Sequence, residues 1–176
     1  MARYYRRRYP RRTFRKRNWS SNIITSETTI TFPVNSTYGG GSAICLNPAQ
    51  SVSTVSQPFT VKNIKLSISA NAKDAGGIQL IDQLVAALVY VPQGYSVTYN
   101  TLSEHPEWFM AVKFLDNPQV DDSVSVNTGY IQKPFTISTR LARKLQTGDS
   151  IQLCLFGTNK AQNSPVPIRF SFTAVS

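Results

Sequence analysis

The sequence has very few of the residues that enzymes and metal proteins use. It contains one histidine, His105, and two cysteines, Cys45 and Cys154, which are far apart along the chain. These are too few ligands for a four-coordinate zinc site. No serine lies in a Gly-x-Ser-x-Gly motif, and Gly39-Gly40-Gly41 lacks the Lys-Ser/Thr ending of a phosphate-binding loop, so flexibility explains those glycines better. We therefore expect no catalytic residues, no metal, no cofactor and no enzyme activity.

Long hydrophobic runs are also missing. No stretch approaches the roughly 18 apolar residues of a membrane span, so no membrane insertion is expected. The basic N-terminus is not followed by an apolar segment, which argues against a secretory signal peptide. We interpret the two cysteines as buried thiols in a reducing compartment rather than as a disulfide.

Acidic residues are absent from the first 17 positions, which hold nine of the 19 basic residues of the chain. The remainder has ten basic and nine acidic residues and is nearly neutral. A segment this dense in positive charge repels itself and cannot form a core. We expect residues 1–21 to be an extended, disordered arm and residues 22–176 to form one folded domain. The basic residues of the arm are Arg3, Arg6, Arg7, Arg8, Arg11, Arg12, Arg15, Lys16 and Arg17.

The composition of the arm predicts binding to nucleic acid. Guanidinium groups contact phosphate in pairs of hydrogen bonds, and a flexible polycation gains affinity by releasing counterions. Aromatic residues are interleaved with the arginines and could stack on unpaired bases, which favours a single-stranded ligand. They are Tyr4, Tyr5, Tyr9 and Phe14. A solvated tail without a partner and a signal for the nuclear import machinery are the other interpretations of the same residues.

The body has the two-residue period of β-strands. Ile64, Leu66 and Ile68 alternate with polar residues, while Leu84–Val91 is continuously apolar, as in a strand buried on both faces. Most of Trp108–Leu115 and Ile151–Phe156 show the same buried pattern. Many short strands between turn signals predict an all-β sandwich or jelly roll. The expected strands are 23–34, 59–69, 83–92, 108–115, 129–139, 149–157 and 165–175, with an eighth at 42–46, 95–99 or 120–126. One short helical turn is expected at Leu141–Leu145.

Arg140, Arg143 and Lys144 form the only cluster of basic residues in the body. They could provide a second phosphate contact on the surface that faces the nucleic acid. The alternative interpretation is a solvated turn at the end of a strand.

Three segments resemble the capsid proteins of circoviruses and other Rep-encoding single-stranded DNA viruses. The opening MARYYRRRYPRR, residues 1–12, carries the closest likeness, because those arms also mix arginine, tyrosine and proline. The segments ALVYVPQG, residues 87–94, and TRLARKLQTGDSI, residues 139–151, are similar in a looser way.

The resemblance implies a single viral jelly roll, an eight-stranded antiparallel β-sandwich, behind a disordered basic arm. It also implies a homo-oligomer of sixty copies, a T=1 icosahedral shell around circular single-stranded viral DNA, found in the virion and assembled in the host nucleus. It identifies no host receptor. The alternatives are a capsid protein of a small RNA satellite-type virus and a cellular protein that binds single-stranded nucleic acid through a β domain. In a protein of the latter kind, the folded face usually carries the basic and aromatic residues.

Overall fold

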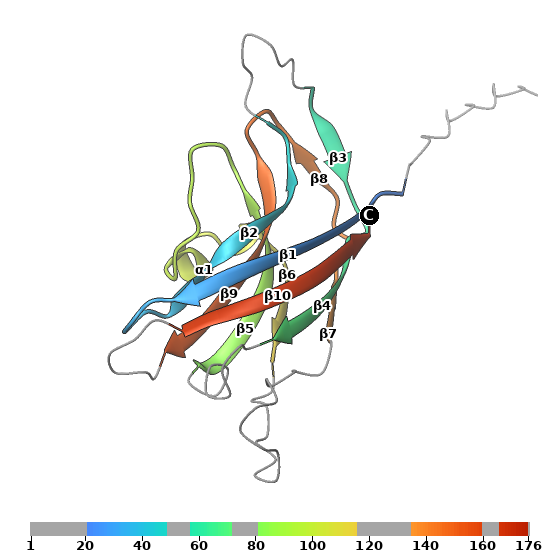
Figure 1. The fold of residues 1–176 in the computed structure, drawn as a ribbon. Helices are drawn as coiled ribbons and strands as arrows, with labels where there is room; N and C mark the ends of the chain where they lie inside the picture. The colour runs from blue at the N-terminus through green and yellow to red at the C-terminus, as the bar shows by residue number, and fades with distance from the viewer. Residues whose placement is uncertain (1–20, 49–56, 72–80, 116–134, 160–165, 176) are drawn as a thin grey trace, which may run out of the picture.

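The computed structural model describes residues 21–48, 57–71, 81–115, 135–159 and 166–175. These residues are nearly all in antiparallel β-sheets (Figure 1). The strands are β1 (Ile23–Phe32), β2 (Tyr38–Leu46), β3 (Phe59–Val61), β4 (Lys65–Asn71), β5 (Ile81–Val91), β6 (Phe109–Phe114), β7 (Phe135–Ser138), β8 (Arg143–Leu145), β9 (Ser150–Asn159) and β10 (Val166–Val175). A short helix, α1 (Thr101–Glu104), and a 3-10 turn, η2 (Pro106–Trp108), precede β6.

Two four-stranded sheets make up the body, in an arrangement consistent with a β-sandwich. One has the strand order β1-β10-β4-β7 and the other β2-β9-β5-β6, while β3 and β8 form a separate two-stranded sheet. Every ladder is antiparallel. The all-β expectation is therefore confirmed at this level.

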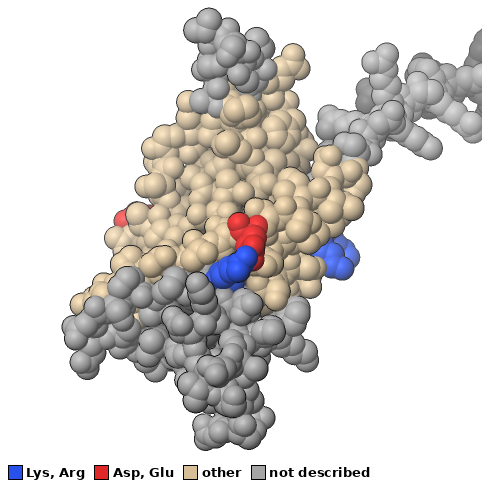
Figure 2. All heavy atoms as spheres, in the orientation of Figure 1, with Lys and Arg blue, Asp and Glu red and all other residues tan. Residues whose placement is uncertain are grey.

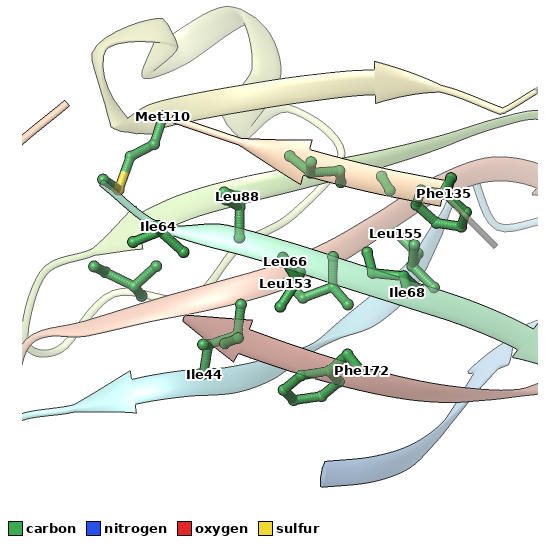
Figure 3. Close-up of a cluster of buried hydrophobic side chains, with 14 of the residues drawn as sticks. Ile44, Ile64, Leu66, Ile68, Leu88, Met110, Phe135, Leu153, Leu155 and Phe172 are labelled. Carbon is green, nitrogen blue, oxygen red and sulfur yellow. The ribbon is translucent and has the colours of Figure 1, made fainter. Parts of the chain in front are cut away.

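The core lies between the two sheets and follows the two-residue period of the sequence. Leu66 and Ile68 of β4 point inward from one sheet, and Leu153 and Leu155 of β9 point inward from the other (Figure 3). All four side chains are almost fully buried. Burying a leucine or isoleucine side chain stabilises a fold by about 1.5–3 kcal/mol, so this interior provides most of the driving force for closing the sandwich.

Strands β5 and β9 are buried on both faces, as the continuous apolar runs predict. Their outward side chains form a second cluster that includes Ala87, Val89, Cys154 and Phe156. Val97 and Trp108, from the segment between β5 and β6, pack on this cluster. That segment therefore covers the part of the outer face of the β2-β9-β5-β6 sheet that β5 and β9 form.

The same prediction was wrong for β6. Phe114 is 75% exposed and Val112 is 46% exposed, because β6 is the edge strand of its sheet. An apolar run alone does not distinguish a central strand from an edge strand.

The expected strand 59–69 is two strands. Val61 ends β3, Asn63 takes a positive φ of 55°, and β4 begins at Lys65. The helical turn expected at Leu141–Leu145 was also wrong, because Arg143–Leu145 is strand β8, paired with β3. A segment of only a few residues between turn-forming residues is too short to show the period of a helix or a strand. Its pairing partner therefore decides its structure.

The eighth long strand is β2, which contains the 42–46 candidate. Residues 95–99 are not a strand, and 120–126 lie outside the described residues. The glycines at the start of β2 serve packing rather than flexibility. A Cβ on Gly39 would lie 2.5 Å from the ring of Phe32, which is fully buried, and Gly40 has a φ of 133°. Only glycine lets the strand pass this close to the ring.

Candidate nucleic-acid interface

The predicted arm residues lie outside the described part of the chain, but its attachment point is described. Ile23 opens β1 and pairs with Val175 of β10, which pairs with Lys65 of β4, which pairs with Ser138 of β7. These four residues form one row across the end of the sheet. The segment that carries nine basic residues therefore joins the body at a defined corner of the β1-β10-β4-β7 sheet (Figure 1).

The cluster Arg140, Arg143 and Lys144 is divided by the local structure. Arg140 and Lys144 are exposed, while Arg143 is half-buried. Arg143 and Lys144 are neighbours on β8, so their side chains leave on opposite faces of the strand. The three residues share a segment without forming one continuous basic surface.

Arg143 is engaged with the folded body. Its guanidinium donates a hydrogen bond to the carbonyl oxygen of Glu107 and lies over the ring of Tyr90, 5.5 Å from the ring centre. A guanidinium over an aromatic face is held by a cation–π attraction. These contacts connect β8 to β5 and to the segment that covers the second sheet.

Tyr90 is part of a partly buried polar network centred on the buried Asp149. The Asp149 carboxylate accepts hydrogen bonds from the Tyr90 hydroxyl at 2.7 Å, the Gln93 backbone N–H at 3.0 Å and the Gln146 backbone N–H at 2.7 Å. Burial, followed by the hydrogen bond to Asp149, raises the pKa of Tyr90 to about 12. The network fixes the turn between β8 and β9 and, through Arg143, the position of the neighbouring basic segment.

His105 packs against other side chains of the covering segment. Its ring stacks on Trp108 with a centroid distance of 3.9 Å and an interplanar angle of 4°, and its Nδ1 lies 3.1 Å from a carboxylate oxygen of Glu107. The rings of Tyr95 and Trp108 are nearly perpendicular, with their centroids 5.3 Å apart. These contacts give the residue a packing role.

Lys65 is a basic residue that sequence reasoning missed. It is exposed, and it lies two strands from Ile23 in the row where the arm attaches. Thr139, one residue before Arg140, donates its backbone N–H to the carbonyl of Ile64. Lys65 and Arg140 are therefore brought to the same end of the sheet by the pairing of β4 with β7. Lys65 opens an alternating apolar strand pattern, but only the pairing shows that it lies in the same row as Ile23.

The described residues contain no group of three or more His, Cys, Asp or Glu side chains placed to hold a metal ion. Cys45 and Cys154 are not joined by a disulfide, and burial raises the pKa of both thiols. No helix in the described ranges is long and apolar enough to cross a membrane.

No protein-family model and no curated protein sequence matches this chain. Among solved structures, the chain is similar to one titled "Structure of infectious bursal disease virus Gx strain", with a TM-score of 0.33 and 11% sequence identity. The match covers 89% of this chain and 32% of the other, so this chain spans about a third of that protein's length.

Proposed function

We propose that this protein is the capsid protein of a small single-stranded DNA virus, with a jelly-roll shell domain at 22–176 and an arginine-rich packaging arm at 1–21. The observation that carries the proposal is the pairing order of the strands, considered with the dense positive charge of residues 1–17.

The pairing of the eight long strands supports a jelly roll. In chain order these strands are β1, β2, β4, β5, β6, β7, β9 and β10. The first pairs with the last, the second with the seventh, the third with the sixth and the fourth with the fifth, and successive pairs alternate between the two sheets. A long antiparallel hairpin rolled around the core has this pattern, which is the topology of jelly rolls.

The charge distribution supports packaging through the arm. The nearly neutral body lets subunits associate without strong mutual repulsion, while sixty arms of nine cations bring on the order of 500 positive charges to the packaged strand. This binding is independent of sequence, because a flexible polycation has no rigid groups aimed at base edges. Under this proposal the protein is structural and not catalytic. It is found in the virion and, during assembly, in the host nucleus.

Electron microscopy of negatively stained protein tests the assembly. We expect uniform closed shells about 15–20 nm across, the size that sixty domains of this mass enclose. Digestion of the extracted cargo with DNase or RNase separates the DNA-virus assignment from that of an RNA satellite-type virus. A protein that stays monomeric across salt and pH would contradict both assignments and favour a cellular nucleic-acid-binding protein.

Removal of the arm tests the packaging mechanism. Deleting residues 1–17 is expected to leave the folded body intact and to abolish binding to a single-stranded oligonucleotide. A matched variant with the nine basic residues of 1–17 changed to glutamine keeps the chain length and should lose binding to the same extent. Unchanged affinity and salt dependence in either variant would place the binding site on the body.

A further inference from the structure

The outward face of the β1-β10-β4-β7 sheet carries mostly hydroxyl groups. Its described outward positions alternate with the core positions Ile30, Leu66, Ile137 and Phe172. The hydroxyl face, as we name this surface, contains Thr25, Thr29, Thr31, Ser67, Ser69, Thr136, Ser138, Ser171 and Thr173, all exposed or half-buried. Figure 2 shows this side of the molecule, on which basic and acidic atoms are few.

The pairing register arranges these hydroxyls in rows. One row, Thr25, Thr173, Ser67 and Thr136, crosses all four strands. The Oγ1 atoms of Thr25 and Thr173 lie 3.3 Å apart. Neighbouring rows are separated by about 7 Å along the strands, and neighbouring strands by about 4.8 Å. The face is thus a regular array of hydroxyl groups, of which Ser171 donates to a carboxylate oxygen of Glu27.

The charged residues on this face do not repel an anion. Glu27 is paired with Arg169, whose terminal nitrogen donates to a carboxylate oxygen at 2.6 Å, and this hydrogen bond holds the pKa of Glu27 below its usual value. Lys65 is the other charged residue among the described outward positions, so their formal sum is +1. A polyanion can approach without meeting an uncompensated carboxylate.

The point at which the arm joins the body connects this face to a nucleic acid. Arg17 is six residues before Ile23, and six residues span at most about 20 Å. A single strand of nucleic acid that the arm binds is therefore brought to the edge of the hydroxyl face. Val97 and Trp108 cover part of the outer face of the other sheet, and the exposed residues Val112 and Phe114 at its edge are apolar, whereas the hydroxyl face is mostly exposed and polar.

We infer that the hydroxyl face is a second contact surface for single-stranded nucleic acid, with Lys65 pairing to a phosphate and the serine and threonine hydroxyls donating to phosphate oxygens. Serine and threonine make such contacts in nucleic-acid complexes, and they carry no sequence information. The inference rests on the proposed packaging function. A second copy of this chain fits less well, because interface centres are apolar and aromatic, whereas the centre of this face is polar.

Binding of a fluorescein-labelled oligo-dT of 30 nucleotides to the full chain, washed free of cargo, tests the inference. Ser67→Glu puts a negative charge at the centre of the face and is expected to weaken binding roughly fivefold, the upper end of what one exposed charge contributes. Ser96→Glu, at an exposed position on the covering segment of the other sheet, should leave the dissociation constant within about twofold. Thr136→Glu repeats the test on β7, should Ser67→Glu fail to fold.

The salt dependence isolates the contribution of Lys65. Lys65→Gln is expected to reduce the slope of log K against log salt by about 0.7, the value for one phosphate contact on a single strand. Lys113→Gln, an exposed lysine on β6 of the other sheet, should leave the slope unchanged.

The outcomes separate this inference from the proposed function. If the wild-type chain does not bind the oligonucleotide, or binds it equally without the arm, the packaging proposal fails. If the arm is required but Ser67→Glu and Ser96→Glu bind alike and Lys65→Gln keeps the slope, only the hydroxyl face is excluded. Loss of shells in Ser67→Glu with unchanged oligonucleotide affinity would identify the face as a contact between subunits and overturn the inference.

Discussion

Replacing Asp149 by asparagine should destabilise the fold far more than the loss of one surface charge would. Asp149 is 4% exposed, and its two carboxylate oxygens accept three hydrogen bonds, two of them from backbone N–H groups. One oxygen accepts from Gln93, and the other accepts from both Tyr90 and Gln146. The turn between β8 and β9 depends on this one side chain.

The magnitude follows from what an amide can accept. Asparagine has one acceptor oxygen and one NH₂ donor, so in either orientation the NH₂ group faces a backbone N–H of Gln93 or Gln146. A donor left without a partner costs about 1–3 kcal/mol, and the remaining bonds lose their charge assistance. We expect Asp149→Asn to lower the free energy of unfolding by about 2–3 kcal/mol, and the melting temperature by about 5–10 °C.

Urea unfolding followed by tryptophan fluorescence measures this change, because Trp108 is buried in the folded protein. Glu104→Gln is the matched control, since Glu104 is an exposed carboxylate on α1 and its substitution should change stability by less than about 0.5 kcal/mol. Tyr90→Phe removes one of the three donors and should cost about 1.5 kcal/mol. Equal stabilities for Asp149→Asn and Glu104→Gln would refute the argument that the carboxylate holds this turn.

Three further outcomes follow from the packing and the charges. Gly39→Ala places a methyl group 2.5 Å from the Phe32 ring and should lower the free energy of unfolding in urea by about 1–3 kcal/mol. Gly94→Ala meets no atom within 4 Å and should lower it by about 1 kcal/mol, because the φ of Gly94 is 82°. The reverse order of the two effects would contradict the packing role of Gly39. Arg143→Ala should lower the melting temperature, because Arg143 contacts Glu107 and Tyr90, and should leave the oligonucleotide affinity within twofold. Lys144→Ala should leave the melting temperature unchanged. A large loss of affinity in Arg143→Ala would show that Arg143 contacts the ligand instead. Burial raises the pKa of Cys154 to about 12 from an ordinary value of 9.0, so the stability linked to its neutral thiol is present below pH 9 and declines between pH 9 and 12. At pH 8 a thiol reagent should label Cys45 before Cys154, because Cys154 is buried and Cys45 is only half-buried. Equal labelling rates would contradict this burial.

The sequence by itself determined the division into a cationic segment and a nearly neutral β body. Charge is a property of composition, and nine basic residues without an acidic one cannot be hidden by any fold. Strand class could also be predicted, because alternation such as Leu66 and Ile68 against Ser67 is local along the chain. The continuous runs of β5 and β9 likewise predicted central strands with both faces buried.

Tertiary structure decided what depends on strands far apart in sequence. Phe114 is exposed and Leu155 is buried, although each is the second-to-last residue of an apolar run, because one strand is at the sheet edge and the other is central. Arg143–Leu145 is a strand only because Phe59–Val61 is there to pair with it. Gly39 and Phe32 are close in sequence, but only the packing of β2 against β1 places the glycine against the ring.

The candidate interface shows the same division. The basic residues of 1–17 could be predicted from their density along the chain, but Lys65 and the row from Thr25 to Thr136 could not. Neighbouring members of this row are 148, 106 and 69 residues apart in sequence, and only the hydrogen-bonded register of β1, β10, β4 and β7 sets them side by side. Register is fixed by which faces are buried, and a sequence read one segment at a time does not contain that information.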